Sequence, residues 1–458
     1  MSHKLGDLNF MKAISLFACG GIGDLGLRHA GFDVLVANEL LSDRAEVFKH
    51  NFPQTKMIVG DVWEKENEIL EAISVALKGE ELDLVFATPP CQGMSKNGRG
   101  KLLSLIRQGL KDSVDERNLL IIPAISIFKK SGAHTLVMEN VPEMESTIIP
   151  HPKNTREPIN IIELIKEELG SNFSSSIRVV EFANYGVPQS RQRLISIFTR
   201  NENLKKYIAS QGSLFPRETH SKDGTFGKKW VTVKDAIGNT PILDASSPET
   251  ASCEEIPYHR VPLLDEEKYF WVSNTPSEKS AFDNQCVNSA CRFDKNQVHS
   301  TGKDANGINR SSRETPIRCQ KCGELLPRPW VRKDGDYRLM KGYTSAYKRM
   351  SWNAPASTLT RNLSYACSDN KLHPEQNRVL SLYEAMKLHT VMDYPFDWKR
   401  QDGKRVSDKL IRELIGESVP PLGLDVIFSH LFLLIQNENL DQLSHRLVGQ
   451  QELCFTVE

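Results

Sequence analysis

Apolar runs of strand length alternate with helix-like segments over the first 200 residues. The runs occupy 13–17, 33–37, 57–59, 82–87, 134–138, 177–182 and 194–198. Between them, Ile69, Ile73 and Leu77 recur at helical spacing. Further helices are expected over 24–30, 42–51, 119–128 and 161–169. This alternation is typical of a parallel sheet with helices on both faces, so we predict a doubly wound α/β fold.

The rest of the chain has a different character. From about residue 201 the alternation ends, and proline, asparagine, serine and histidine become more frequent up to residue 350. Helical character returns at 411–428. A chain of 458 residues also exceeds what one hydrophobic core usually supports, so we expect two domains.

Composition excludes several classes of protein. The chain is 39% hydrophobic and 25% charged, and it has neither an apolar run of membrane-spanning length nor a signal peptide near Met1. Its 9 cysteines indicate free thiols in a reducing compartment, so we expect a cytoplasmic location. Lysine plus arginine and aspartate plus glutamate both number 58, so any surface for nucleic acid must be a local patch.

A turn at the end of a predicted strand contains the first candidate catalytic residue. Pro89, Pro90 and Cys91 follow the apolar run 82–87. Two prolines fix φ and remove two N–H donors, so this turn is stiff. Open α/β sheets bind and react with ligands at the carboxyl ends of their strands. The position favours a nucleophilic Cys91, and a buried cysteine used as a small hydrophobe is the alternative.

Earlier strand ends suggest a nucleoside cofactor. The first predicted strand leads into a turn that contains Phe17, Gly20, Gly21 and Gly23. The amides of such a turn can approach a ligand at a helix N-terminus. Glu39 ends the second strand, where a carboxylate can hold two ribose hydroxyls, and Asp61 ends the third, where it could accept from an exocyclic amine. The chain lacks a Gly-Lys-Ser/Thr phosphate loop there, so a methyl donor fits better than a nucleoside triphosphate.

Later strand ends add an acid and two cations. Glu139 follows the run 134–138, and Arg191 and Arg193 precede the last run. Residues i and i+2 of an extended segment point the same way, so the two arginines can serve one site. Taken singly, Glu139 could be a solvated acid and the arginines a salt-bridging pair. Together with Cys91 they place a thiol, an acid and cations at one edge of the sheet.

With these motifs the chain resembles the DNA (cytosine-5)-methyltransferases. The matching segments, in the family's order, are Phe17–Gly26, Pro89–Gln92, Glu139–Val141, Gln189–Arg193 and Gly416–Pro421. The resemblance implies S-adenosylmethionine as cofactor and methyl transfer to carbon 5 of cytosine in double-stranded DNA. It also implies that Pro89 and Ser418 lie at the cofactor, together with the glycine-rich turn and the acids that follow the next two strands.

The family's chemistry gives the other residues their roles. Cys91 would add to carbon 6 of cytosine and so place electron density on carbon 5. Glu139, with a raised pKa, would bind N3 and the exocyclic amine. Arg193 would hold O2, and Arg191 would brace its loop or the DNA backbone. The target base would be rotated out of the duplex into the pocket.

Four positions depart from the family's pattern, and one of them is Met94, where an aromatic residue is common. Cys19 and Ile22 stand where glycine is usual, and Glu417 stands where asparagine is usual. The geometry of the cofactor turn is therefore not predicted. We expect Cys19 to be a packing residue.

The family places a variable target-recognition region between the arginine motif and the last motif. We therefore assign 1–200 to a catalytic domain, 201–400 to a smaller, irregular target-recognition domain and 401–458 to a segment that returns to the catalytic domain.

Two cysteine pairs in the target-recognition domain indicate a metal. Cys286 and Cys291 precede Cys319 and Cys322, and the second pair lies in a Cys-x2-Cys-Gly turn. This spacing matches structural zinc, which would stabilise a loop-rich segment with little core. The alternative is four unpaired thiols in loops. His299 is a substitute ligand if one cysteine is not used.

Basic and aromatic residues are interleaved after the cysteines. The candidates for DNA contact are Arg328, Arg332, Arg349 and Arg361. Such side chains can hold phosphates, and arginine can also bind base edges. A solvated basic surface is the alternative, and the base that each residue contacts is not predicted.

Two other functions are open at this point. One branch of the family methylates tRNA, and a catalytically silent DNA-binding regulator could have the same fold. The zinc element favours duplex DNA, and the joint presence of Cys91, Glu139 and Arg193 argues against a silent protein. We expect a monomeric protein of prokaryotic or phage origin that associates with the nucleoid and not with a membrane, and that functions alongside a restriction endonuclease.

Overall fold

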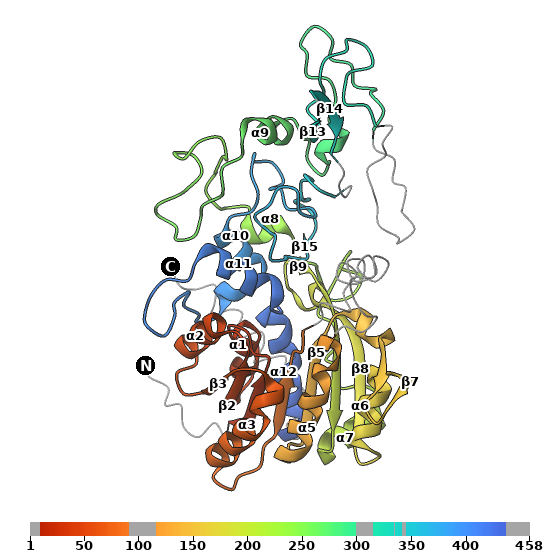
Figure 1. The fold of residues 1–458 in the computed structure, drawn as a ribbon, viewed down its shortest axis with the longest axis vertical. Helices are drawn as coiled ribbons and strands as arrows, with labels where there is room; N and C mark the ends of the chain where they lie inside the picture. The colour runs from red at the N-terminus through yellow and green to blue at the C-terminus, as the bar shows by residue number, and fades with distance from the viewer. Residues whose placement is uncertain (1–9, 91–115, 299–314, 334, 341–344, 437–458) are drawn as a thin grey trace.

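The computed structural model describes residues 10–90, 116–298, 315–333, 335–340 and 345–436. Figure 1 shows a lower lobe built around a β-sheet and an upper lobe made mostly of loops. The last part of the described chain, drawn in blue, runs back from the upper lobe into the lower one. The lower lobe is therefore formed by segments from both ends of the described chain.

A seven-stranded sheet forms the centre of the lower lobe. Its strands are β1 (Met11–Leu16), β2 (Phe32–Glu39), β3 (Lys56–Val59), β4 (Leu84–Ala87), β5 (Thr135–Asn140), β8 (Ser174–Glu181) and β10 (Gln192–Thr199). Their order is β3-β2-β1-β4-β5-β10-β8, and β1 to β5 run parallel. The order reverses between β1 and β4, as in doubly wound folds. The predicted α/β architecture is confirmed.

The sheet is mixed, which corrects the expectation that it is parallel throughout. β10 pairs antiparallel with both β5 and β8. Only residues 182–191 join β8 to β10, and they contain η3 (Phe182–Tyr185) and β9 (Gln189–Ser190). A short connection suits antiparallel neighbours, whereas parallel neighbours need a longer crossover. The apolar runs could not reveal this, because their pattern is the same in either direction.

Helices cover both faces of the sheet. One face carries α3 (Val62–Leu77), α5 (Ile121–Ser131) and α6 (Ile161–Leu169). The other carries α1 (Ile22–His29), α2 (Ser42–Asn51), α7 (Glu202–Gln211) and α12 (Pro421–Gln436). Each face buries its own hydrophobic cluster, so Leu84 and Phe86 of β4 enter one and Val85 enters the other. Burial on both faces is why the central strands are nearly continuous apolar runs.

Helix α1 packs directly on α12. A Cβ atom at Gly26 would lie 2.5 Å from Pro421 O and 2.7 Å from Asp425 N, so only glycine allows this approach of the two backbones. Phe428 of α12 also reaches the sheet, with its ring centroid 5.2 Å from that of Phe86. The last described helix is therefore part of the lower-lobe core.

The upper lobe has a small core of its own, which includes Trp271, Phe282, Trp330 and Tyr347. Its elements are α9 (Glu266–Ser273), η4 (Ala281–Asp283), β13 (Trp330–Lys333) and β14 (Asp336–Leu339). Short elements elsewhere are η1 (Glu116–Leu120), η2 (Pro142–Ser146), β6 (Ile148–His151), β7 (Asn154–Asn160), β11 (His220–Ser221), β12 (Lys228–Lys229) and α8 (Val233–Ile237).

The chain rejoins the lower-lobe core before residue 401. Met350, Leu359 and Met386 are buried in the same cluster as α12. The elements of this stretch are β15 (Ala356–Ser357), α10 (Leu382–Leu388), η5 (Val391–Asp393) and α11 (Asp408–Glu417). β15 pairs with β9, directly before β10. By packing, the returning segment begins near Met350, and the division into functional domains stays a prediction.

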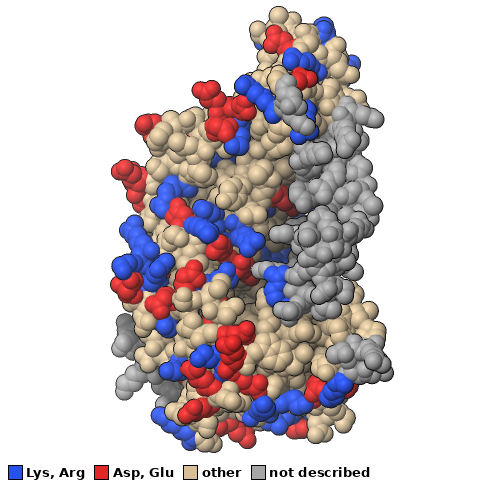
Figure 2. All heavy atoms as spheres, in the orientation of Figure 1, with Lys and Arg blue, Asp and Glu red and all other residues tan. Residues whose placement is uncertain are grey.

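Charges of both signs are mixed on the surface. Figure 2 shows basic and acidic side chains side by side over the lower lobe on the face in view. Within the described residues, no single helix has the length and apolar character needed to cross a bilayer, and only the bent pair of α11 and α12 meets that criterion jointly.

We expect Gly26→Ala to lower the free energy of unfolding by about 2 kcal/mol, because the added methyl group meets backbone atoms that cannot rotate away. Gly23→Ala is the matched control on the same helix, since its Cβ would lie 3.4 Å from the nearest atom, an ordinary contact. Urea unfolding measures both variants. Equal stability of the two would contradict direct packing of α1 on α12.

Candidate active site

The carboxyl ends of β1 and β4 are neighbours at the point where the strand order reverses, which is the usual ligand crevice of such sheets. The Thr88 amide donates to Leu16 O at 3.2 Å, and the Thr88 hydroxyl donates to Phe17 O at 3.0 Å. These bonds hold the glycine-rich turn after β1 beside the turn that begins at Pro89. The structure therefore brings the predicted residues Phe17 and Pro89 together.

Glu39 holds the backbone of the glycine-rich turn. Its carboxylate oxygens accept from the amides of Cys19 at 2.9 Å and Leu41 at 2.8 Å. Burial raises the pKa of Glu39. Each oxygen has a second lone pair for a ligand. Gly21 caps α1 with a φ of 85°, a conformation that favours glycine.

Asp61 lies at the same edge of the sheet. Glu39 is paired with Val59 in the register of β2 and β3, and Asp61 follows two residues later. Its Oδ1 accepts from the Trp63 amide at 2.9 Å and so caps α3. The predicted bond from an amine to Asp61 stays a prediction.

Two departures from the family's pattern meet at Arg44 of α2. Arg44 forms an ion pair with Glu417, and its Nη1 lies 3.7 Å from Cys19 Sγ. Cys19 has a φ of 51°, in the region that suits glycine. Burial raises the pKa of Cys19 to about 12, so the thiol is neutral and packs against the main cluster, as expected.

Cys91 lies outside the described residues, which stop at Pro90. The turn before it is fixed by Asn140, whose Nδ2 donates to Pro89 O at 3.1 Å. Asn140 Oδ1 accepts from the Val141 amide at 2.8 Å. Asn140 thus ties the end of β5 to the turn that leads to Cys91.

Glu139 and Arg193 form an ion pair beside this turn. Arg193 Nε lies 2.9 Å from Glu139 Oε1, and the side chains are 15% and 10% exposed. The antiparallel register, which sets Ile195 opposite Glu139, brings the two together. Burial raises the pKa of Glu139, and the positive charges of Arg193 and Arg191 oppose this shift. A buried acid and cation therefore face one edge of the sheet.

Arg191 points into the protein. Its side chain is 1% exposed, and its guanidinium donates to the carbonyl oxygens of Leu359 at 2.9 Å, Gly416 at 3.1 Å and Ser418 at 2.6 Å. Arg191 therefore braces the loop before β10, which is one of the two roles predicted for it. Its predicted contact with the DNA backbone is wrong in this structure because the side chain is buried, and its place among the catalytic residues stays a prediction. Arg191 lies between β9 and β10, where the extended strand is interrupted, so the i, i+2 argument fails.

Ser418 lies between α11 and α12 and is 9% exposed. Its Oγ lies 3.0 Å from His389 Nε2, and its carbonyl accepts from Arg191. The preceding Glu417 contacts Arg44 beside the cofactor turn. Ser418 is therefore held close to the segment that the sequence assigned to the cofactor.

Comparison with known proteins agrees with this geometry. The family model described as C-5 cytosine-specific DNA methylase matches residues 11–432. The chain belongs to this family. It is a DNA (cytosine-5)-methyltransferase, and S-adenosylmethionine is the methyl donor of the family.

Relatives extend over nearly the whole methylase. The type II methyltransferase M1.HgaI of Avibacterium volantium is 29% identical over 438 residues, which cover 94% of this chain and 99% of the relative. M.NgoPII of Neisseria gonorrhoeae is 27% identical over 346 residues, which cover 75% of this chain and 83% of the relative. A solved DNA modification methyltransferase encoded within an E. coli prophage has a TM-score of 0.54 at 18% identity, covering 93% of this chain and 99% of that one. This last likeness concerns the fold alone.

The methylase brings its four predicted zinc ligands together. The sulfur atoms of Cys286, Cys291, Cys319 and Cys322 all lie within 4.8 Å of one another. The Cys286–Cys322 and Cys291–Cys319 distances are 3.7 and 3.9 Å. A tetrahedral zinc ion with Zn–S bonds of about 2.3 Å requires S–S distances of about 3.8 Å, whereas a disulfide has about 2.05 Å. The donors fit zinc. The substitute ligand His299 lies outside the described residues.

The turn at Cys319 favours a thiolate. Desolvation opposes ionisation of this thiol, but hydrogen bonds from the amides of Cys322 and Lys321 and from the thiols of Cys322 and Cys286 lower its pKa to about 6, while the pKa values of those two thiols are raised. Gly323, with a φ of 77°, closes the turn by donating to Cys319 O at 2.9 Å.

Two of the four arginines predicted to contact DNA are buried, so those two predictions are wrong in this structure. Arg328 is 0% and Arg349 is 3% exposed. Arg328 donates to the carbonyls of Asn284, Gln297 and Pro316. Arg349 donates to those of Val272, Thr275, His373 and Gln376. A loop-rich lobe leaves many buried carbonyls to satisfy, and arginine has five donors.

Arg332 and Arg361 remain at the surface. Their side chains are 68% and 60% exposed, and each lies near one carboxylate, Glu267 at 3.7 Å and Glu417 at 3.9 Å. Both are placed where a polyanion could reach them, and their contact with DNA stays a prediction.

Sequence reasoning missed several buried polar residues. Arg378 and Glu384 form a fully buried pair, 2.7 Å apart, and Glu384 completes a capping box with Ser381 at the start of α10. The Ser-x-x-Glu spacing was a signal for that box. His389 and Arg44 gave no signal, because a single residue has no spacing.

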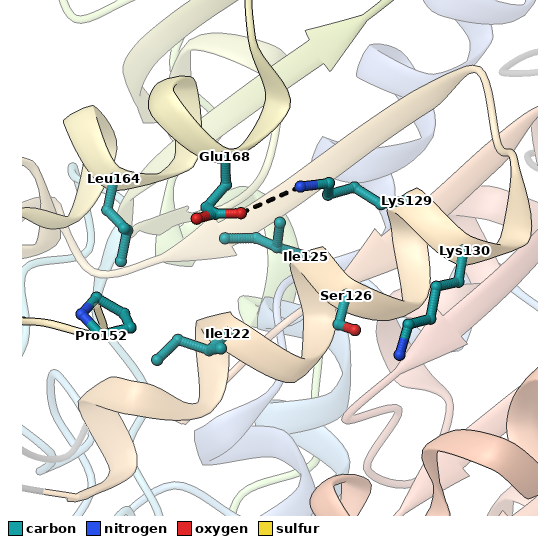
Figure 3. Close-up of a pocket in the computed structure, with 8 residues that line it drawn as sticks. All are labelled: Ile122, Ile125, Ser126, Lys129, Lys130, Pro152, Leu164 and Glu168. Carbon is teal, nitrogen blue, oxygen red and sulfur yellow. Dashed lines mark hydrogen bonds and ion pairs between the residues drawn. The ribbon is translucent and has the colours of Figure 1, made fainter.

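Two surface grooves lie apart from these residues. Figure 3 shows one of about 300 Å³ between α5 and α6, with Ile125 and Leu164 lining it and the Lys129–Glu168 ion pair across it. The second, of about 390 Å³, is lined by residues that include Tyr258 and Trp398. Neither is lined by a predicted site residue.

Asp24, in the first turn of α1, makes stability depend on pH. It is 2% exposed, and its Oδ1 has no hydrogen-bond partner among the described residues. Burial raises its pKa from 3.8 to about 7. The folded state therefore holds a proton that the unfolded state has lost, so this residue makes stability fall as pH rises from about 4 to 7 and adds no slope above.

We expect Asp24→Asn to remove this slope, because the amide does not titrate. The variant should gain up to about 4 kcal/mol over wild type between pH 4 and pH 8. Denaturant unfolding of both proteins at the two pH values measures the difference. A difference independent of pH would mean that Asp24 is ionised in the folded protein.

Proposed function

We propose that this methylase modifies carbon 5 of one cytosine within a specific sequence of double-stranded DNA, through a covalent bond to Cys91. The observation that carries the proposal is the ion pair between the buried Glu139 and the half-buried Arg193, next to the turn that leads to Cys91. An acid and a cation at this edge can together hold the polar edge of a cytosine.

Each side chain then has a distinct task. The Cys91 thiolate adds to carbon 6, which disrupts the aromatic ring and makes carbon 5 nucleophilic. Glu139, whose pKa is raised by burial, donates a hydrogen bond or proton to N3 and accepts from the exocyclic amine. Arg193 holds O2. Loss of the carbon 5 proton and expulsion of the Cys91 thiolate then restore the ring.

S-adenosylmethionine supplies the methyl group when bound. The residues proposed to hold it are Phe17, Gly20, Gly21, Gly23, Glu39, Asp61, Pro89 and Ser418. Their chemistry fits, since a glycine-rich turn at a helix N-terminus and an acid at the next strand end are the groups that bind a nucleoside at this crevice. Support comes from the Glu39 carboxylate, which is buried next to the turn and keeps lone pairs for ribose hydroxyls.

The DNA would contact both lobes. Carbon 6 of a stacked base is shielded, so the target cytosine must leave the duplex to reach Glu139. Arg332 of β13 and Arg361 are proposed to contact the DNA, because both are exposed and arginine binds phosphates and guanine edges.

A structural zinc ion is proposed at Cys286, Cys291, Cys319 and Cys322. Four thiolates would complete a tetrahedral shell and leave no position for a catalytic water. The ion would join two segments on either side of 292–318, close to where β13 begins. Its task would be to fix the fold of the target-recognition lobe.

We expect one zinc ion per chain by elemental analysis. Cys319→Ala should lose the metal and weaken sequence-specific DNA binding by more than about tenfold, because metal binding supplies folding energy to this lobe. Binding of S-adenosylmethionine, on the separate sheet, should change little. Cys367→Ala is the matched control, since this cysteine is exposed and outside the cluster. Purified protein with far less than one metal equivalent and four freely titratable thiols would rule the site out.

The biological setting is proposed from the relatives. Because the similar proteins are named as type II methyltransferases of bacteria, we propose that this methylase acts as a monomer in the bacterial cytoplasm. There it would protect DNA from a companion restriction endonuclease.

Cys91→Ser should lower methylation more than about 1,000-fold while duplex binding is kept, because a hydroxyl is a far weaker nucleophile than a thiolate. Duplex DNA with 5-fluorocytosine at the target should form a stable adduct with wild type only, since fluorine cannot leave as a proton does.

The test uses bisulfite sequencing of DNA from expressing cells, followed by denaturing gels of the adduct. Parallel assays on tRNA and duplex DNA separate the two substrates. Methylation of tRNA alone, or full activity of Cys91→Ser, would overturn the proposal.

A further inference from the structure

Besides Arg191, a second connection joins the same segments and runs through His389. The Leu359 amide donates to Gln189 Oε1 at 3.0 Å. Gln189 Nε2 lies 3.1 Å from His389 Nδ1, and His389 Nε2 lies 3.0 Å from Ser418 Oγ. Gln189 and His389 are both fully buried. The connection links β9, the end of α10 and the segment before α12.

The donors and acceptors along this connection are fixed. Because Gln189 Oε1 accepts from a backbone amide, Gln189 Nε2 is the donor to His389 Nδ1. His389 Nδ1 therefore carries no proton, and the Nε2–H group donates to Ser418 Oγ. The Ser418 hydroxyl is then oriented toward Ile415 O, 3.5 Å away. One neutral tautomer satisfies every bond.

The surroundings keep the ring neutral. Burial, together with the positive charges of Arg191 and Arg193, holds the pKa of His389 well below its ordinary value. A proton on Nδ1 would face the Gln189 amide group and break the connection.

The backbone next to the ring is strained and held in place. Thr390 has a φ of 59°, which a β-branched residue rarely adopts. Its Oγ1 accepts from the Leu422 amide at 3.3 Å, near the start of α12. Strain of this kind persists only where the surroundings enforce it, and it clusters at functional sites.

The two connections hold the same two residues at different atoms. Leu359 is bound at its amide by Gln189 and at its carbonyl by Arg191. Ser418 is bound at its carbonyl by Arg191 and at its hydroxyl by His389. Arg191 thus fixes the backbone of Ser418, and His389 fixes its side chain.

We propose that His389, as the neutral Nε2–H tautomer, is a positioning residue for methyl transfer, because it fixes Ser418 Oγ so that the second lone pair of this oxygen can accept from the cofactor. The inference rests on the proposed function, in which Ser418 belongs to the cofactor site. His389 acts through Ser418 and not on the reacting atoms.

Three variants test the role. His389→Leu removes both hydrogen bonds at similar volume. His389→Gln can restore them, because its oxygen can accept from Gln189 and its amide can donate to Ser418. His430→Leu is the matched control, since His430 is another buried histidine and its Nε2 has no hydrogen-bond partner among the described residues.

We expect His389→Leu to raise the KM for S-adenosylmethionine about tenfold with a change in kcat below about threefold, as loss of a buried hydrogen bond implies. His389→Gln should return KM to within about threefold of wild type, and His430→Leu should leave it unchanged. Thermal unfolding of each variant separates these effects from loss of folded protein.

Calorimetric binding of S-adenosylhomocysteine keeps this test apart from the proposed function, because it requires no turnover. If wild type binds the compound but methylates no DNA, the proposed function fails and the role of His389 is still measured. Unchanged binding and KM in His389→Leu, or equal impairment of His389→Leu and His389→Gln, would refute the positioning role.

Discussion

The buried guanidinium of Arg191 joins the segment before β10 to two later segments of this methylase. Burial of a charged group costs free energy unless its N–H donors are hydrogen-bonded. The carbonyl groups that accept from Arg191 therefore cannot move apart without a large loss of stability. Here the acceptors are backbone carbonyls of Leu359, Gly416 and Ser418, which come from two segments far along the chain. Arg193 follows two residues later and pairs with Glu139. The strand that carries Arg193, the cation proposed to bind the base, is therefore tied through Arg191 to the segment that contains Ser418.

The upper lobe relies on the same physical device. Arg328 and Arg349 each collect several carbonyls from loops that have little regular hydrogen bonding of their own. The four clustered cysteines add a place for a metal cation. In the upper lobe, hydrogen bonds from buried arginines to loop carbonyls provide stabilisation that the sheet and helices provide in the lower lobe.

The sequence predicted most of the fold and the central residues of the site, because strand ends in an α/β sheet converge on one edge. Glu139 and Arg193 lie side by side in the lower lobe as their motifs indicated, and the four cysteines form a separate cluster in the upper lobe as their spacing indicated. The direction of β10 was not predictable, since an apolar run has the same pattern whether its strand runs parallel or antiparallel to its neighbours. The inward turn of Arg191 and the burial of Arg328 and Arg349 depend on which carbonyls lack partners, and this is a property of the folded loops. His389 could not be found, because its role arises from contacts between residues about 200 positions apart, which is the separation of Gln189 and His389.

The packing of α12 on α1 has a consequence for biosynthesis. Phe32 has its ring centroid 6.0 Å from that of Phe428, so one face of the sheet is completed only by residues that are synthesised about 400 positions later. Until then α1 and α2 cover only part of the apolar surface of β1, β2 and β4 on this face, and the part that packs on α12 is exposed. The early strands therefore keep exposed apolar surface through much of translation, and such surface on a nascent chain is a binding site for chaperones.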